Sequence, residues 1–378
     1  MTLCLRVLTV KLAAMQELDS TWMRLLWPVR AAAVPLYYAG YRWSRRTYDR
    51  GGGVRLDAPV ICVGNLTVGG SGKTPATIAL AQMLLEQGRK PAVLSRGYKR
   101  AANSAAPTVV AAGDEICCGV EQAGDEPLLI AREAPGVAVV AHPNRAEAGR
   151  LALEQLGCDT LLLDDGFQHW ALRRDANIVC VDANLPLSRA RLLPLGPYRE
   201  PLSALQRADA VLLTQSSDAR LLSERREELR ALPGLKRETP VWEAIAQPVE
   251  LRSIQPEQSA PELAALNGAK IVAACAIARP EYFRRTLLEL GADVAELVSL
   301  PDHARWDPAA VERIEALARR HRAGMILITA KDRVKMEERL EFASPWFSLE
   351  SRIQWPEEQK YEIRRFLNQA IDAFSSQT

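Results

Sequence analysis

Long apolar runs are missing from this sequence of 378 residues. Hydrophobic residues make up 48% and charged residues 25%, an ordinary globular composition that argues against a multi-span membrane protein or a disordered chain. A strong charge of either sign is also missing: the net charge is +2, so the overall balance predicts no nucleic-acid partner. There is no internal repeat or low-complexity tract, and the length predicts two domains rather than one.

Paired cysteine motifs are absent as well. The chain has seven cysteines, an odd number, and no C-x-x-C pair, which excludes the usual zinc and dithiol spacings. Cys62, Cys180 and Cys275 lie in apolar runs, where a free cysteine behaves as a small hydrophobe. These features predict a reducing, cytoplasmic environment. The adjacent Cys117 and Cys118 are interpreted as two loop thiols, with a reactive pair as the less favoured alternative.

Aromatic residues are scarce overall but gather near the N-terminus. The segment Trp22–Tyr48 holds three of the eight tryptophans and four of the eight tyrosines, mixed with five arginines. A spanning helix needs about 20 apolar residues, and the longest uncharged run, Ala31–Tyr41, is shorter. The small-residue cleavage site of a signal peptide is absent. Residues 1–50 are therefore predicted to contain a membrane-associating interfacial helix; the alternative is a helix packed on the protein's own core.

From Pro59 onward, apolar runs alternate with segments of helical spacing. Runs of this length, bounded by Gly, Pro and Asp, are typical of strands buried on both faces of a parallel sheet. The intervening helices are predicted at residues 76–86 and 145–156. The sequence therefore predicts a doubly wound α/β domain over residues 51–240. Its strands are expected at residues 60–63, 92–94, 108–111, 137–140, 160–163, 177–181 and 210–213.

A second, smaller α/β lobe is predicted at residues 269–378. Its first strand begins at Lys270, and a helix at residues 281–290 and a strand at residues 325–329 follow. The stretch before it, rich in Pro, Glu and Gln, is interpreted as an inter-domain connection at residues 241–268.

The clearest motif is VICVGNLTVGGSGKTP at residues 60–75, between a predicted strand and a predicted helix. That context is the one a phosphate-binding loop (P-loop) requires. Its glycines let backbone N–H groups face phosphate oxygens, and the helix N-terminus adds a partial positive charge. Lys73 is expected to reach the β and γ phosphates, and the Thr74 hydroxyl to ligate Mg²⁺. The residues predicted to bind ATP are Thr67, Val68, Gly69, Gly70, Ser71, Gly72, Lys73 and Thr74, with Thr67 standing where the usual motif has its first Gly.

A second motif, TLLLDDGFQHW at residues 160–170, delivers two carboxylates at the C-terminal end of a predicted strand. Ligands of open α/β sheets bind at that edge, so Asp164 and Asp165 are predicted to hold Mg²⁺. If the strand continued, the two side chains would point to opposite sides; which of them contacts the metal stays open. The nearest match to a guanine-reading Asn-Lys-x-Asp motif is Thr-Ala-Lys-Asp at residues 329–332, so guanine specificity is disfavoured.

Seven motifs in order carry a family resemblance: GNLTVGGSGKTP, SRGY, GDEP, DDGFQH, LLPLGPYRE, PDH and KDRVK. From about Trp22 to Lys335 the chain resembles the tetraacyldisaccharide 4′-kinases of lipid A biosynthesis. The resemblance implies ATP-dependent phosphorylation of the 4′-hydroxyl of an acylated disaccharide 1-phosphate, giving the 1,4′-bisphosphate. It also implies an active site between two α/β lobes and work at the cytoplasmic face of the bacterial inner membrane. The predicted N-terminal helix would make the protein peripheral or monotopic there, and no obligate protein partner is evident from the sequence.

The same resemblance assigns residue roles. Asp125 of GDEP and His303 of PDH are the implied catalytic pair, acting with Lys73; a carboxylate within reach of the acceptor hydroxyl can take its proton. The residues implied to bind or position substrate are Arg96, Arg145, Gln168, His169 and Arg199. Where the family usually has Thr-Glu-Lys-Asp, this chain has Ala330, and Lys331 and Asp332 are accordingly left out of the catalytic set.

Two other functions fit parts of the pattern. A nucleotide-dependent switch or carrier would use the same phosphate-binding loop and hydrolyse ATP slowly. A kinase of soluble small molecules is disfavoured by the aromatic and arginine-rich N-terminal segment. Transfer of phosphate to an acylated disaccharide separates the first alternative from the kinase.

Overall fold

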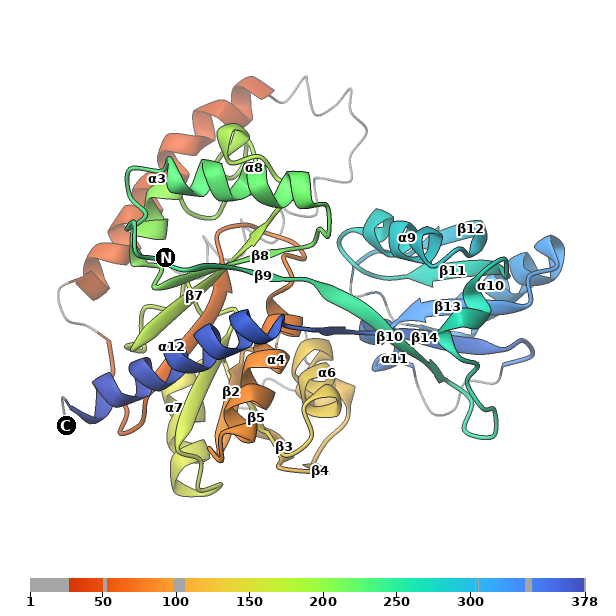
Figure 1. Ribbon diagram of the computed structural model, residues 1–378, viewed down its shortest axis with the longest axis horizontal. Coiled ribbons are helices and arrows are strands. Elements are labelled where there is room, and N and C mark those ends of the chain that lie inside the picture. The colour runs from red at the N-terminus through yellow and green to blue at the C-terminus, as the bar shows by residue number, and fades with distance from the viewer. Residues whose placement is uncertain are drawn as a thin grey trace.

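The computed structural model describes residues 27–49, 53–97, 106–302, 304, 306–336 and 342–376. His303, one half of the predicted catalytic pair, lies outside the described residues, as do residues 1–26. Within the described part, the chain builds a nine-stranded sheet and a five-stranded sheet. Figure 1 shows the two units side by side, and the chain passes between them from β9 to β10 and again from β14 to α12.

The large sheet has the order β4-β3-β5-β2-β6-β1-β7-β8-β9. From β5 to β9 all neighbours are parallel, while β3 and β4 are antiparallel additions at one edge. The strands are β1 (Val60–Asn65), β2 (Pro91–Ser95), β3 (Thr108–Ala112), β4 (Glu115–Ile116), β5 (Ala138–Ala141), β6 (Thr160–Asp164), β7 (Ala176–Asp182), β8 (Ala210–Thr214) and β9 (Val241–Ala244). The seven strands predicted from apolar runs are all present.

Helices cover both faces of this sheet because successive strand residues point to opposite sides. Ile61 and Val63 of β1 belong to the core on the face of α4 (Lys73–Glu86), α6 (Asp125–Glu133) and α12 (Glu357–Ser375). Val60 and Cys62 belong to the other core, with α7 (Arg145–Glu154) and α8 (Ala219–Arg230). The predicted doubly wound fold is therefore confirmed.

The small sheet has the order β10-β14-β13-β11-β12. Its strands are β10 (Ala246–Ser253), β11 (Lys270–Cys275), β12 (Asp293–Ser299), β13 (Met325–Thr329) and β14 (Trp346–Ile353). Only β10 is antiparallel to its neighbour. The helices α9 (Pro280–Glu289), α10 (Pro308–His321) and the short α11 (Ala330–Arg333) complete this unit. Its α/β character and its helix at residues 281–290 match the expectation.

The segments around the expected domain boundaries contain regular structure. Strand β9 extends the large sheet beside β8, and β10 already belongs to the small sheet. Helix α12 returns to the large unit, where Ile363 and Leu367 are fully buried in the core beside α4. The chain therefore crosses between the units twice, and the boundaries at residues 240/241 and 268/269 stay predictions.

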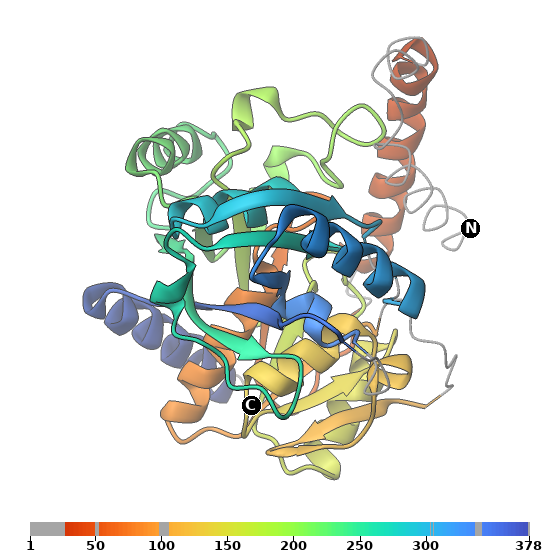
Figure 2. The ribbon, with the colours of Figure 1, turned by 90° about the vertical axis from the view of Figure 1, so that its right-hand side faces the viewer.

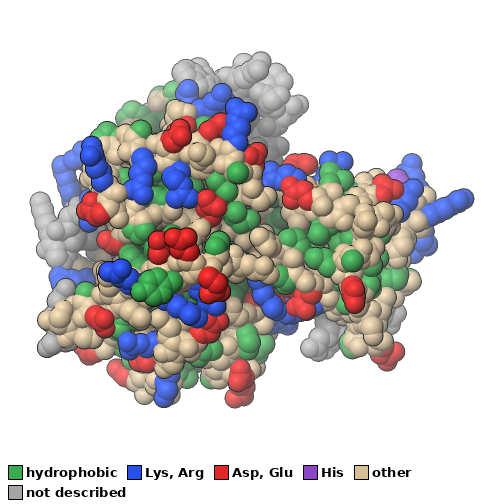
Figure 3. Space-filling view, viewed as in Figure 1, with side chains coloured by type: hydrophobic (Ala, Val, Ile, Leu, Met, Phe, Trp, Pro, Cys, Tyr) green, Lys and Arg blue, Asp and Glu red, His purple; other side chains and the backbone are tan. Residues whose placement is uncertain are grey.

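Helix α3 (Trp27–Asp49) runs along the side of the large unit, as Figure 2 shows. It is fixed to the segment that carries LLPLGPYRE: Arg30 Nε donates to the Pro194 carbonyl oxygen at 2.9 Å, and Tyr37 Oη donates to the Arg199 carbonyl oxygen at 2.8 Å. Among the described residues, no helix is both long and apolar enough to cross a membrane. On the face seen in Figure 3, basic and acidic side chains are interspersed.

Candidate active site

The loop between β1 and α4 is held in shape by its own polar side chains. Asn65 Nδ2 donates to Thr67 Oγ1 at 3.2 Å and to Ser71 Oγ at 2.5 Å, and Lys73 Nζ donates to Ser71 Oγ at 3.5 Å. Thr67 is buried and forms an antiparallel bridge with Tyr198. The residue that departs from the usual glycine is thus the point where the loop pairs with the LLPLGPYRE segment.

The glycines of the loop present bare backbone to the solvent. Gly69 and Gly70 are exposed, and a Cβ added at Gly70 would meet no atom within 4 Å. Gly69 and Gly72 adopt positive φ angles of 91° and 72°, which L side chains rarely adopt. Since α4 begins directly after the loop at Lys73, its N-terminal N–H groups face the same space. This is the geometry of an anion-binding loop.

The two predicted metal carboxylates differ in environment. Asp164 ends β6 and is buried, and its Oδ1 accepts a hydrogen bond from Thr77 Oγ1 at 3.2 Å. Asp165 lies 3.6 Å from Lys73 Nζ and 3.2 Å from Arg199 Nη1 through its two carboxylate oxygens. Asp165 has a φ of 51°, so the strand stops at Asp164. The continued strand geometry on which the predicted opposite orientation depended is therefore absent.

The carboxyl groups of Asp164 and Asp165 also differ in pKa. Burial, reinforced by the charges of Glu126 and Asp165, raises the pKa of Asp164 to about 7. Desolvation also acts on Asp165, but the positive charges of Arg199 and Lys73 outweigh it and hold the pKa of Asp165 below its usual range. The site therefore keeps Asp165 ionised beside the loop, and a bound cation would favour the ionised form of Asp164.

This donor set suits Mg²⁺ that is shared with phosphate. Among the described residues, no group of three or more His, Cys, Asp and Glu side chains could hold a metal by itself. The carboxylates of Asp164 and Asp165 and the hydroxyl of Thr74, in the first turn of α4, offer oxygen ligands only. Mg²⁺ commonly takes one or two carboxylates and completes its shell with water and substrate phosphates. The residues present fit the ion.

The predicted substrate residues Gln168 and Arg199 are built into one network. Gln168 Nε2 donates to the Asn65 carbonyl oxygen at 2.8 Å and to Glu200 Oε1 at 2.9 Å, and Arg199 Nη1 donates to Gln168 Oε1 at 3.3 Å. The network ties the end of β1 to the LLPLGPYRE segment. His169 is partly exposed, and its carbonyl oxygen accepts a hydrogen bond from Arg174 at 2.7 Å.

Two further predicted residues stand at the same edge of the sheet. Arg145 opens α7 and is buried; its Nη1 donates to the carbonyl oxygens of His142 and Pro143 at 3.3 and 3.2 Å. Its positive charge contributes to the lowered pKa of Asp165. Arg96 follows β2 and is exposed.

Asp125 is the first residue of α6, at the seam between the two units. The neighbouring Glu126 Oε1 lies 3.6 Å from Lys331 Nζ, and Lys331 Nζ also lies 3.5 Å from Asp302 Oδ1. The structure therefore places Lys331, which the sequence reasoning left out, between the GDEP and PDH motifs. Only a pattern of charges distributed over both units could have indicated it.

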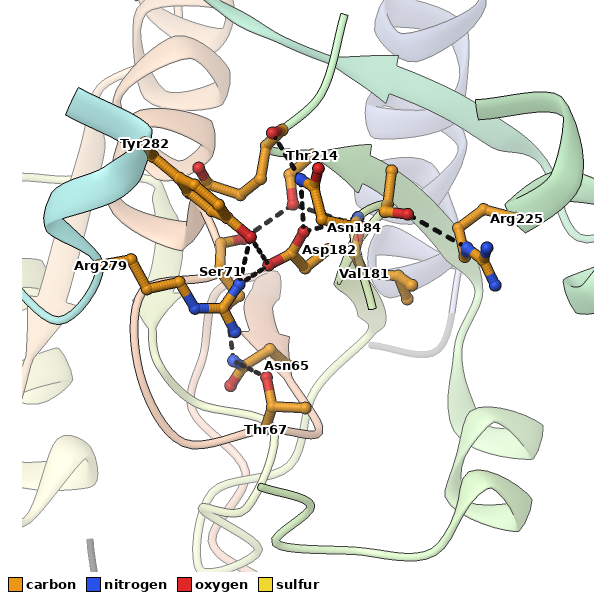
Figure 4. A network of polar contacts seen from close by, with 12 residues as sticks. Asn65, Thr67, Ser71, Val181, Asp182, Asn184, Thr214, Arg225, Arg279 and Tyr282 are labelled. Atoms are coloured by element: carbon orange, nitrogen blue, oxygen red, sulfur yellow. Dashed lines mark hydrogen bonds and ion pairs between the residues drawn. The ribbon is translucent and has the colours of Figure 1, made fainter. Parts of the chain in front are cut away.

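A second seam network reaches the phosphate-binding loop from the other side (Figure 4). Asp182 ends β7 and is buried; it pairs with Arg279 and accepts a hydrogen bond from Tyr282 Oη at 3.2 Å. Thr214 Oγ1, at the end of β8, donates to the Ser71 carbonyl oxygen at 3.0 Å. Small-unit side chains are thus fixed beside the loop. No motif in the sequence pointed to Asp182 or Arg279.

Comparisons with known proteins agree on one family. The family model described as tetraacyldisaccharide-1-P 4′-kinase matches residues 22–372. The tetraacyldisaccharide 4′-kinase of Syntrophus aciditrophicus is 42% identical over 307 residues, covering 79% of this chain and 82% of that relative. The one from Geobacter sulfurreducens is 38% identical and covers 87% and 90%. The solved structure of LpxK from Aquifex aeolicus in complex with ATP shares 30% identity, with a TM-score of 0.68 over 93% of this chain and 99% of that one.

Proposed function

The chain belongs to the tetraacyldisaccharide-1-P 4′-kinase family, and we propose that phosphoryl transfer takes place at its cluster of Lys73, Asp164 and Asp165. The activity is ATP-dependent phosphorylation of the 4′-hydroxyl of a tetraacyldisaccharide 1-phosphate in lipid A biosynthesis. ATP and Mg²⁺ are its cofactors, and its acceptor is a lipid disaccharide.

The observation that carries the site assignment is the convergence of charges at one sheet edge. Lys73 Nζ and Arg199 Nη1 reach Asp165 at 3.6 and 3.2 Å, directly beside a loop of exposed glycines. The loop N–H groups and Lys73 bind the β and γ phosphates and offset the charge that builds up during transfer. Mg²⁺ held by Thr74, Asp164 and Asp165 supplies further charge neutralisation when bound.

Asp125 is proposed as the base that accepts the proton of the 4′-hydroxyl, with His303 as its partner. Asp125 is the first residue of α6, and its neighbour Glu126 pairs with Lys331 of the small unit, so an acceptor bound between the two units would meet this end of the helix. Arginines suit an acceptor that carries a 1-phosphate because their guanidinium groups make paired hydrogen bonds to phosphate oxygens. Arg96, Arg145 and Arg199 are proposed for this contact, and Gln168 and His169 for positioning.

Transfer of labelled phosphate from ATP to an acylated disaccharide 1-phosphate in detergent tests this proposal. The wild-type protein is expected to label the lipid, and Asp125→Asn to lose transfer while it still binds nucleotide. Asp114→Asn, which changes an exposed carboxylate outside the site, is the matched control and should stay active. ATP hydrolysis without lipid labelling would instead favour the nucleotide-dependent switch, and an active Asp125→Asn protein would refute the base.

We propose that the protein acts at a membrane surface, because of the side chains that helix α3 exposes. Val29, Leu36 and Trp43 are exposed by 68%, 76% and 56% and recur every seven residues, so they lie along one face of the helix. Over about 21 Å this face presents apolar side chains, and Arg42 and Arg46 lie exposed near its end. Tyr37 and Tyr41 instead face the protein. Helix α3 therefore packs on the protein and exposes a stripe suited to the interface of an anionic lipid surface.

Vesicle flotation tests this placement at the cytoplasmic face of the inner membrane. Leu36→Ser combined with Trp43→Ser should reduce partition onto anionic vesicles while transfer to a detergent-dispersed acceptor persists. The matched control is Leu288→Ser on α9, which also removes an exposed leucine, 45% accessible, but from the small unit. Unchanged partition of the α3 variant would refute the lipid-facing stripe.

A further inference from the structure

Helix α6, which begins with the proposed base Asp125, is held at both ends by side chains of α11. Near its first turn, Glu126 Oε1 lies 3.6 Å from Lys331 Nζ. At its last residue, Glu133 Oε1 lies 2.7 Å from Arg333 Nη2. The two glutamates are seven residues apart, about 10 Å along the helix. The small unit thus contacts α6 at two points.

The two points differ in burial: the Glu133 side chain is 9% exposed, and that of Glu126 is 36% exposed. Arg333 is 17% exposed and also pairs with Glu350 at 3.0 Å, and Glu133 receives a second cation, Arg252, at 2.9 Å. This end of α6 lies in a cluster that includes two arginines, Arg252 and Arg333, and three glutamates, Glu133, Glu250 and Glu350. At the other end, the ammonium group of Lys331 joins the large unit to the small one.

Helix α11 is itself fixed, so Lys331 has a defined starting point. Asp332 is fully buried; it accepts hydrogen bonds from the Ala276 N–H and from Thr329 Oγ1 at 3.2 and 2.6 Å, and it lies 2.5 Å from Lys335 Nζ. The Thr329 hydroxyl in turn caps the first turn of α11. The KDRVK motif therefore combines an internal anchor, Asp332, with two side chains that reach α6.

Four carboxylates act on the ammonium group of Lys331: Glu126, Asp302, Asp125 and Asp332. Glu126 and Asp302 are its nearest partners, at 3.6 and 3.5 Å, and Asp125 is close enough to act on it. Desolvation disfavours the ammonium form, but the charges of these four carboxylates outweigh it and raise the pKa of Lys331. Lys331 is the charge that allows the acidic start of α6 to lie against the acidic loop at Asp302.

We propose that Lys331 is a positioning residue for phosphoryl transfer: by pairing with Glu126 and Asp302, it sets the start of α6, and with it Asp125, relative to the small unit. The inference rests on the proposed role of Asp125. It adds a residue from the small unit that orders the acceptor side of the site.

Kinetics distinguish this role from a contribution to stability. A partly exposed ion pair contributes about 0–1 kcal/mol to folding, so Lys331→Met should fold. A displacement of the base by about 1 Å can reduce the rate by about 100-fold. Lys331→Met should therefore lower kcat by about 10- to 100-fold with little change in the KM for ATP, and Lys331→Arg should recover part of the loss.

The experiment measures kcat and both KM values for transfer to the acylated disaccharide 1-phosphate. Lys360→Met is the matched control, because Lys360 also forms a partly exposed ion pair, with Glu86 at 3.5 Å, but on α12 away from the site. Glu126→Gln, which removes the partner instead, should lower kcat in the same direction. Combined with Lys331→Met it should add little, since both changes break the same interaction.

The outcomes separate this inference from the proposed function. Wild-type kcat in Lys331→Met beside an inactive Asp125→Asn protein would overturn the positioning role, as would full additivity of Lys331→Met and Glu126→Gln. A wild-type protein that hydrolyses ATP without labelling the lipid would instead refute the proposed transfer site.

Discussion

Alanine substitutions at two glycines of the phosphate-binding segment should have different effects: Gly64→Ala should destabilise the fold, and Gly70→Ala should weaken ATP binding. A Cβ at Gly64 in β1 would lie 2.5 Å from Phe167 Cβ and 2.8 Å from Phe167 N. Phe167 is fully buried and its N is backbone, so either β1 or the DDGFQH turn must move. Overpacking of this kind costs about 1–3 kcal/mol. Gly64→Ala should therefore lower the free energy of unfolding by that amount.

Gly70→Ala should leave folding almost unchanged, within about 0.5 kcal/mol. A Cβ there meets no atom within 4 Å, and its position faces the space that the phosphates are proposed to occupy. The added methyl group would keep backbone N–H groups from approaching phosphate oxygens. The KM for ATP should rise by about tenfold or more, which corresponds to about 1.4 kcal/mol of lost interaction.

Urea unfolding and steady-state transfer kinetics on the same preparations check both effects. Gly324→Ala is the matched control, because its Cβ would meet only the Lys270 carbonyl oxygen, at 4.0 Å, far along the chain from the loop. It should match the wild type in both assays. A Gly70→Ala protein with wild-type KM for ATP would refute the exposed backbone as the phosphate contact. A Gly64→Ala protein of wild-type stability would refute the close approach of β1 and the DDGFQH turn.

Two further predictions concern buried charges. In the metal-free protein, the free energy of unfolding should fall by up to about 4 kcal/mol as pH rises from about 4 to about 7. The reason is that burial raises the pKa of Asp164 from 3.8 to about 7, and the folded state loses its extra proton over that range. Urea unfolding at several pH values checks this, and Asp164→Asn should flatten the decline. Arg279→Met leaves the buried Asp182 carboxylate without its cation and should destabilise the protein by about 3–5 kcal/mol. The Arg279→Met/Asp182→Asn double variant should recover part of that loss. A stable single variant would contradict the assignment of this pair as a seam contact.

Burial on both faces made the strands of the large sheet predictable. Runs such as Val60–Val63 and Leu161–Leu163 are apolar at every position, and a chain segment of that kind has few alternatives to a central parallel strand. The glycine-rich loop was predictable for a similar reason, since its chemistry is local. By contrast, Asp165 has a φ of 51° and lies outside the strand. Two adjacent aspartates in a sequence do not indicate that the strand ends at the first, Asp164, and that the backbone changes direction at the second, Asp165.

Contacts between distant segments were not predictable from local pattern. The amphipathic stripe of α12 indicates a packed helix, but its return to the large sheet depends on where β14 ends in space. Lys331 illustrates the same limit for the site. Its value as a positioning residue depends on Glu126 and Asp302, which come from both units and lie far apart in the sequence.

The LLPLGPYRE segment shows how such contacts join the lipid-facing helix to the chemistry. Tyr198 pairs with Thr67 of the phosphate-binding loop, and the Arg199 side chain contacts Asp165. The carbonyl oxygen of the same Arg199 accepts the hydrogen bond of Tyr37, whose neighbour on α3, Leu36, belongs to the exposed apolar stripe. One residue therefore links the proposed metal carboxylate to the helix proposed to rest on lipid. Under that proposed orientation, an acceptor that stays anchored by its acyl chains meets the phosphate-binding loop on the side where the membrane is.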